Sequence, residues 1–265
     1  MKRRTCLNTL AGAAWAFGLG SSVQAQVLDL SDAINKAGRQ RMLSQRMAKA
    51  WLALVLGIEV PNAQRVLDKS MALFDSQLIE LKAFAPSPEI RLTYNKLELE
   101  WRDYKTALIG ALPGKSAAAN LLVRDSRVLA LANQGTGLYE ATLGKPVGKL
   151  VNLAGRQRML SQRMAKFYLA AELDVGASSS MAEITKARSE FIQANVLLRD
   201  SPLATQRIRQ ELRQAQGQWV FFDNALQTLK PGSRSERLTT EVFQTSENLL
   251  MAMDSVTTLY SAIQA

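Results

Sequence analysis

The chain has 265 residues, 47% of them hydrophobic and 21% charged, which fits a folded globular protein and excludes a disordered chain. Its formal net charge of +10 favours anionic partners, and the absence of any recognition motif argues against nucleic acid. It has no histidine and a single cysteine, Cys6, so the commonest general base is missing and we predict no enzyme, no cofactor and no metal site.

The first 25 residues have the pattern of an export signal. Three basic residues, 2–4, precede the apolar stretch 10–19, and residues 23–25 fit the small-residue cleavage rule. We therefore predict a signal peptide over 1–25, cleavage near Ala25 and Gln26, and a periplasmic or secreted protein. General secretion and the twin-arginine route both stay open, as does an uncleaved N-terminal anchor.

Residues 26–144 form a first repeat with apolar residues at helical spacing and no alternating β-branched runs. Turn-forming residues divide it into four predicted helices, and the breaks are Gly57 with Pro61-Asn62, Pro86-Ser87-Pro88, and Pro113-Gly114. The predicted N-caps near these breaks are Ser31, Asn62, Ser87 and Ser116.

Residues 145–265 form a second repeat of nearly equal size. The thirteen residues AGRQRMLSQRMAK at 37–49 return unchanged at 154–166, Phe74 matches Phe191, and Trp101 matches Trp219. Breaks at 176–180, 201–202 and 231–233 again divide it into four helices. We predict an all-α fold of two tandem four-helix up-down bundles.

The connection between the repeats constrains how they meet. An up-down bundle of four helices ends on the side where it began, so the short connector 143–148 can start the second repeat there. The two motif helices can then lie side by side and parallel, as in a covalent pseudo-dimer. Two bundles that hang apart remain the alternative.

The repeated motif is basic and contains no acid. On a helix, one stripe of the first copy places an arginine among apolar or small residues, namely Ile34, Gly38, Arg41, Gln45, Ala48 and Leu52. A buried guanidinium needs a counter-charge, and a bound planar anion between two such helices would supply it. Pairing with acids elsewhere in the bundle is the other interpretation, and the candidates are Glu98, Glu100, Asp103 and Glu140.

Residues 34–46 and 151–163 resemble the signature of the type IV pilus methyl-accepting chemotaxis transducer N-terminal (PilJ-type) domain. The signature is similar to the P box in the periplasmic sensor domain of nitrate/nitrite-responsive histidine kinases. The resemblance implies a periplasmic four-helix bundle with the motif on its first helix. In the kinases, one motif arginine from each subunit binds nitrate at a dimer interface. Those arginines correspond here to Arg41 and Arg158, with Gly38 and Gly155 allowing close approach of the backbone.

Together these features predict an exported sensory protein, not an enzyme, that binds a nitrate-like or nitrite-like oxyanion or a carboxylate between the motif helices. The predicted ligand-binding residues are Arg41, Arg158, Gly38, Gly155, Arg46, Arg163, Asn35, Asn152, Gln45 and Gln162. A membrane receptor, a transporter or a pilus-related protein would be the macromolecular partner. The alternative is a structural adaptor that docks on a pilus, envelope or chemoreceptor component, with the arginines serving helix packing.

Overall fold

A computed structural model of the chain describes residues 26–110, 114–233 and 235–264. The described residues form helices and turns with no strand, which confirms the predicted all-α fold. No helix among them is long and apolar enough to span a membrane. The predicted signal peptide and Pro113 lie outside the described residues. The eight helices are α1 (Leu30–Leu56), α2 (Val60–Phe84), α3 (Pro88–Gly110), α4 (Lys115–Leu143), α5 (Pro146–Glu172), α6 (Ala177–Asp200), α7 (Gln206–Gln227) and α8 (Glu236–Ser261).

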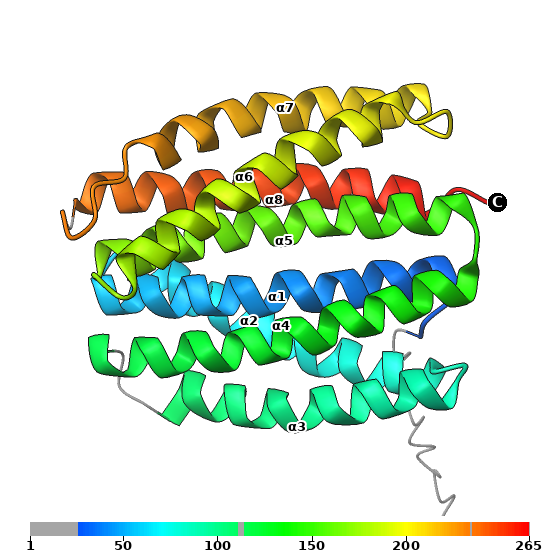
Figure 1. The fold of residues 1–265 in the computed structure, drawn as a ribbon, viewed down its shortest axis with the longest axis horizontal. Helices are drawn as coiled ribbons and strands as arrows, with labels where there is room; N and C mark the ends of the chain where they lie inside the picture. The colour runs from blue at the N-terminus through cyan, green and yellow to red at the C-terminus, as the bar shows by residue number, and fades with distance from the viewer. Residues whose placement is uncertain (1–25, 111–113, 234, 265) are drawn as a thin grey trace, which may run out of the picture.

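The helices form two similar bundles that meet through α1 and α5 (Figure 1). In the first bundle α1 contacts α2 and α4, and α4 contacts α3; in the second α5 contacts α6 and α8, and α8 contacts α7. The most extensive packing between any two helices joins α1 to α5. Figure 1 shows these two helices running in the same direction through the middle of the molecule. The predicted parallel, side-by-side arrangement of the motif helices is therefore confirmed.

Two glycines and one serine at the predicted breaks behave as expected. Gly57 and Gly144 follow α1 and α4 in the left-handed conformation, with φ of 71° and 63°, which a residue without a side chain adopts readily. The Ser87 hydroxyl accepts a hydrogen bond from the Ile90 amide at 3.2 Å, as an N-cap does. These three residues therefore lie at helix boundaries where the sequence predicted breaks, whereas Pro61-Asn62 and residues 177–180 of the predicted break 176–180 lie inside α2 and α6.

The other three predicted caps are wrong. Ser31 lies inside α1, because the Asp29 carboxylate accepts from the Asp32 amide and caps the helix two residues earlier. Asn62 lies inside α2, which begins at Val60 with a proline in its first turn. Ser116 lies inside α4, whose N-cap is Gly114 in an extended conformation.

Equivalent aromatic contacts hold each bundle together. Phe74 stacks on Trp101 with ring centroids 4.2 Å apart, and Phe191 stacks on Trp219 at 4.3 Å. Two buried tyrosines tie the fourth helix of each bundle to the second: the Tyr139 hydroxyl donates to the Leu81 carbonyl at 2.7 Å, and Tyr260 to Leu198 at 2.6 Å. The two halves thus share one construction, which sets α1 and α5 in equivalent positions.

Candidate functional site

The backbones of α1 and α5 approach closely at the two motif glycines. A Cβ atom added to Gly38 would lie 3.8 Å from the Cα atom of Gly155, and a Cβ added to Gly155 would lie 3.8 Å from the Cα of Gly38. Each added Cβ would thus lie at van der Waals distance from the opposite backbone, so the two helices meet at their glycines with no side chain between them. The same added Cβ of Gly38 would lie 3.2 Å from Nη2 of Arg41 and 3.6 Å from Nη2 of Arg158, so the two guanidinium groups are neighbours over the crossing.

Each motif arginine reaches across to the opposite motif helix. Nη2 of Arg41 donates to the Asn152 carbonyl at 3.2 Å and to its side-chain oxygen at 2.7 Å. Nη2 of Arg158 donates to the Asn35 carbonyl at 3.0 Å. Both arginine side chains are fully buried. The structure therefore brings together the two arginines, the two glycines and the two asparagines that the sequence singled out.

The second nitrogen of each guanidinium meets a different group in the two halves. Nη1 of Arg158 donates to the Asp254 carboxylate on α8 at 2.5 Å, which forms an ion pair. Nη1 of Arg41 donates to the side-chain oxygen of Asn133 on α4 at 3.0 Å, and this acceptor is neutral. Among the described residues Arg41 makes no ion pair, and it reaches the Glu140 carboxylate only through Asn152. The pair of arginines thus has one direct counter-charge.

Burial lowers the pKa of both guanidinium groups, and neighbouring positive charges lower it further. The pKa of Arg41 falls from 12.5 to about 9, because the group is desolvated and faces the charges of Arg156 and Arg158. Burial lowers the pKa of Arg158 to about 10, with the attraction of Asp254 opposing the fall. The Nε–H groups of both arginines are buried without a hydrogen-bond partner among the described residues. An anion placed here would relieve both the surplus charge and the unsatisfied donors.

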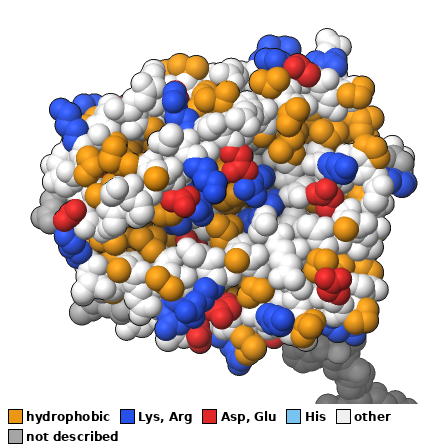
Figure 2. All heavy atoms as spheres, in the orientation of Figure 1, with side chains coloured by type: hydrophobic (Ala, Val, Ile, Leu, Met, Phe, Trp, Pro, Cys, Tyr) orange, Lys and Arg blue, Asp and Glu red, His pale blue; other side chains and the backbone are white. Residues whose placement is uncertain are grey.

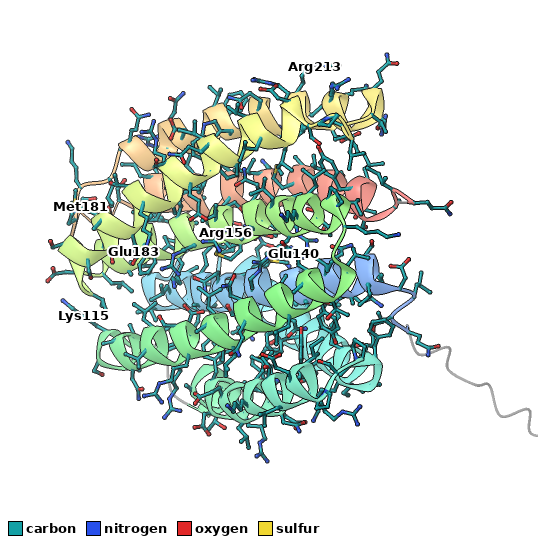
Figure 3. The ribbon with its side chains drawn as sticks, turned by 45° about the vertical axis from the view of Figure 1, so that its right-hand side comes forward. Lys115, Glu140, Arg156, Met181, Glu183 and Arg213 are labelled. Atoms are coloured by element: carbon teal, nitrogen blue, oxygen red, sulfur yellow. The ribbon has the colours of Figure 1, made fainter. Side chains whose placement is uncertain are left out.

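A groove of about 270 Å³ between α4, α5 and α6 opens beside this arrangement, and Asn133 and Arg156 form part of its wall. Figure 2 shows basic and acidic side chains gathered near the middle of this face. Arg156 pairs with Glu190 and also donates to Asn133 at 3.4 Å. Figure 3 shows Arg156 and Glu140 near the seam between α4 and α5. Asn133 is exposed and also accepts a hydrogen bond from Arg41, so it lies between Arg41 and solvent.

The other four predicted site residues lie farther along the motif helices and contact other groups. Arg46 pairs with Glu247, and Arg163 pairs with Glu183 at 2.7 Å. Gln45 donates to Asp125 at 2.6 Å, and Gln162 donates to the Ser246 carbonyl at 2.9 Å. The structure does not place these side chains around the guanidinium pair.

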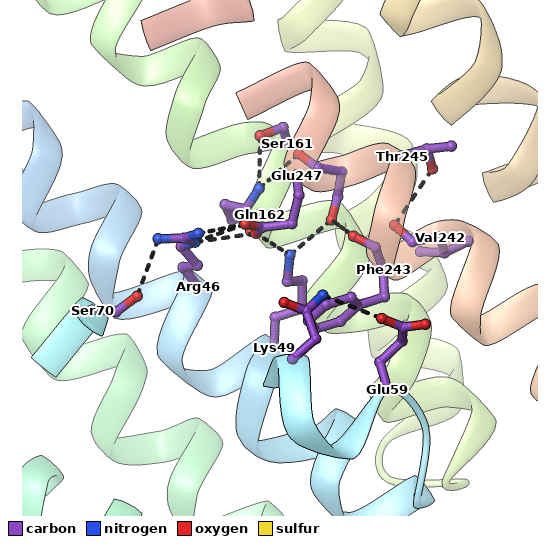
Figure 4. A network of polar contacts seen from close by, with 12 residues as sticks. Arg46, Lys49, Glu59, Ser70, Ser161, Gln162, Val242, Phe243, Thr245 and Glu247 are labelled. Carbon is purple, nitrogen blue, oxygen red and sulfur yellow. Dashed lines mark hydrogen bonds and ion pairs between the residues drawn. The ribbon is translucent and has the colours of Figure 1, made fainter. Parts of the chain in front are cut away.

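Sequence reasoning missed the acids that neutralise the motif. Lys49 on α1 pairs with Glu247 on α8 at 2.6 Å, where Arg46 also converges (Figure 4). Lys166 on α5 pairs with Asp125 on α4 at 2.5 Å, and both side chains are fully buried. Each motif lysine therefore reaches the fourth helix of the other repeat. The repeat does not reveal these acids. When α4 and α8 are aligned, Asp125 matches the residue next to Glu247 and not Glu247 itself.

The acids that the sequence offered as alternative partners act elsewhere. Glu98 pairs with Lys82 at 2.6 Å, and Asp103 pairs with Arg124 at 3.3 Å. Only Glu140 approaches the arginine pair, where its carboxylate accepts from the Asn152 amide. Internal acids therefore neutralise the motif lysines and Arg158, but leave Arg41 without an ion pair among the described residues.

A comparison with protein families finds the same family in both halves of the chain. The family model described as "Type IV pili methyl-accepting chemotaxis transducer N-term" (PilJ) matches residues 23–126 and again residues 144–238. Each match includes one copy of the motif and its arginine. No curated protein and no solved structure matches the chain.

Proposed function

Because the chain belongs to the PilJ family of type IV pili methyl-accepting chemotaxis transducer N-terminal domains, we propose that it is a sensory protein that binds a small anion between α1 and α5. The family is one of chemoreceptor sensory domains, not of enzymes. The two sensory domains comprise residues 26–144 and 145–265. The ligand is a planar oxyanion such as nitrate or nitrite, or a small carboxylate.

The observation that carries this proposal is the buried pair Arg41 and Arg158 with only one direct counter-charge. Two guanidinium groups sit together over the glycine contact, and their Nε–H donors lack partners within the described part of the chain. An uncompensated buried charge is strongly unfavourable, so a fold that retains it gains most from an anionic ligand. A planar oxyanion matches the geometry of guanidinium donors that approach from two sides.

Other polar side chains have supporting roles around the arginine pair. Asn35 and Asn152 orient the guanidinium groups through the contacts across the helix pair. Asn133 and Arg156 form the route by which an anion reaches Arg41 from the groove. Arg46, Arg163, Gln45 and Gln162 support the site indirectly, since their contacts with neighbouring helices fix the positions of α1 and α5.

The signal-like pattern in residues 1–25 supports a periplasmic or secreted location, reached after cleavage near Ala25 and Gln26. Anion binding at the contact between two bundles changes the packing of α1 against α5, and a membrane receptor, transporter or pilus-related protein would read that change. Such coupling requires the anion to bind one arrangement of the helices more tightly than the other.

A second candidate function is that of a structural adaptor without a ligand. Hydrogen bonds from both arginines to chain groups, including Asn133, Asn152 and Asp254, favour this alternative. In that case the arginines would fix helix packing, and the protein would dock on a pilus, envelope or chemoreceptor component.

Titration of the purified protein with nitrate, nitrite, sulfate and small carboxylates tests the proposal. The thermal midpoint of the parent should rise with one class of anion, because a ligand that binds the native state raises its stability. Calorimetry should give the same binding constant. The double variant Arg41→Ala, Arg158→Ala should not respond, while the control Arg65→Ala, changed at an exposed arginine on α2, should respond like the parent. A folded parent that responds to no anion would favour the adaptor.

A further inference from the structure

A second groove lies between α6 and α7, helices that do not contact α1. Its volume is about 540 Å³, which falls in the range of small-molecule sites. Ile192 and Val196 from α6 and Leu212 and Trp219 from α7 form its apolar lining. The Trp219 ring is held by stacking on Phe191. The groove therefore has a rigid aromatic wall that is independent of the arginine pair.

Three arginines, Arg199, Arg209 and Arg213, surround this apolar lining. Arg199 pairs with its neighbour Asp200 at 2.9 Å, and both side chains are more than half exposed. Within the described chain, Arg209 and Arg213 make no ion pair. Figure 3 shows Arg213 at the outer edge of the second bundle. The groove thus combines an apolar interior with a basic rim.

The equivalent seam of the first repeat, between α2 and α3, is crossed by two ion pairs. Lys82 on α2 pairs with Glu98 on α3 at 2.6 Å. Asp75 on α2 pairs with Lys105 on α3 at 2.5 Å and also accepts from the Trp101 indole at 2.7 Å. Two carboxylates therefore join the helices and satisfy the tryptophan N–H group in this half.

The second repeat has lost both of these carboxylates. The match of Phe74 with Phe191 places Ile192 at the position of Asp75. The match of Trp101 with Trp219 places Gln216 at the position of Glu98, and Arg213 at the position of Asn95. Arg199, which replaces Lys82, has no acid to meet across the seam and turns to Asp200. The wall of the groove in the second repeat is therefore apolar and basic, while Arg188 on α6 and Asp223 on α7 form an ion pair that crosses the seam outside the groove.

We propose that the groove between α6 and α7 binds an amphipathic organic anion, a carboxylate or sulfonate carried on an apolar body. The apolar body packs against Trp219 and its aliphatic neighbours, where it removes apolar surface from water. The anionic head pairs with Arg209 and Arg213, whose planar donors suit a carboxylate. This site is separate from the proposed small-anion site, because none of its lining residues lies on α1 or α5.

The test uses the fluorescent aromatic sulfonate 8-anilinonaphthalene-1-sulfonate as the probe and decanoate as the competitor. The parent should show saturable fluorescence that decanoate displaces. The double variant Arg209→Glu, Arg213→Glu should bind the probe at least about tenfold more weakly, because attraction of the head becomes repulsion. The control Arg91→Glu, Lys96→Glu makes the same charge change on exposed positions of α3 and should bind like the parent.

A second variant restores the acids of the first repeat. The double change Ile192→Asp, Gln216→Glu should abolish probe binding, since the new carboxylates would pair with the rim arginines. The Arg41→Ala, Arg158→Ala variant should keep full binding, which separates this proposal from the small-anion site. Probe binding that survives the Arg209 and Arg213 reversal, or that decanoate fails to displace, would overturn the proposal.

Discussion

Methionine in place of Arg41 removes a buried charge while keeping much of the length of the side chain. The fall in the pKa of Arg41 from 12.5 to about 9 corresponds to a penalty on the charged form of about 5 kcal/mol. Against this, the three hydrogen bonds to Asn133 and Asn152 are lost, at about 1 to 2 kcal/mol each. The two contributions nearly cancel. Without a bound anion, the variant should therefore unfold with a free energy within about 2 kcal/mol of the parent value.

Urea unfolding followed by far-ultraviolet circular dichroism, in buffer free of small oxyanions and then with nitrate added, measures this free energy. Only the parent should gain stability from nitrate. Arg158→Met is the matched control, because Arg158 has the Asp254 counter-charge that Arg41 lacks. It should be the less stable variant of the two, although Asp254 keeps its contact with Arg39. If anion-free Arg41→Met loses more than about 3 kcal/mol of unfolding free energy, the argument is refuted, because a loss of that size is expected when the fold needs the charge of Arg41.

Three further predictions concern glycines and acid stability. Gly137→Ala should stabilise the protein by about 1 kcal/mol through helix propensity, because nothing lies within 4 Å of the added Cβ, whereas Gly135→Ala should lower the thermal midpoint, because its Cβ would lie 2.7 Å from the Tyr94 ring. Gly38→Ala should leave the fold intact but weaken the anion-induced thermal shift, because its Cβ would lie 3.2 Å from Nη2 of Arg41. Burial raises the pKa of Glu247, but Lys49 and Arg46 outweigh this effect and hold the pKa at about 2. The ionised Glu247 therefore stabilises the fold above pH 4.5, and this stabilisation is lost as the pH falls toward 2. In urea unfolding across this pH interval, the free energy of unfolding of Glu247→Gln should decline less steeply than that of the parent.

The sequence predicted the helices and the central contact because both depend on local patterns. Gly57, Ser87 and Gly144 mark helix boundaries by their own local preferences. Once an up-down topology is assumed, the identical motif predicts that Gly38 lies beside Gly155. The stripe through Arg41 is buried, as its apolar neighbours require.

The partners of the motif could not be predicted in the same way. Asp254 and Asn133 lie more than 90 residues from the arginines they contact, on helices whose apolar pattern fixes a buried face but not which polar group faces which arginine. The acids suggested from the sequence, Glu98 and Asp103, lie on α3, which barely contacts α1. Long-range pairing depends on the rotation of each helix in the assembled bundle, and one or two residues of shift change it completely.

Duplication within one chain gives this arrangement a freedom that a symmetric dimer lacks. In a homodimer the two contact positions would be occupied by the same residue, so both arginines would meet an acid or neither would. Here the second half provides Asp254 while the first provides Asn133, which also forms part of the wall of the groove between α4, α5 and α6. The same freedom separates the two outer seams, where the first half keeps Asp75 and Glu98 and the second has lost both. Equivalent positions in the two halves can thus carry different groups, which the symmetry of a homodimer would forbid.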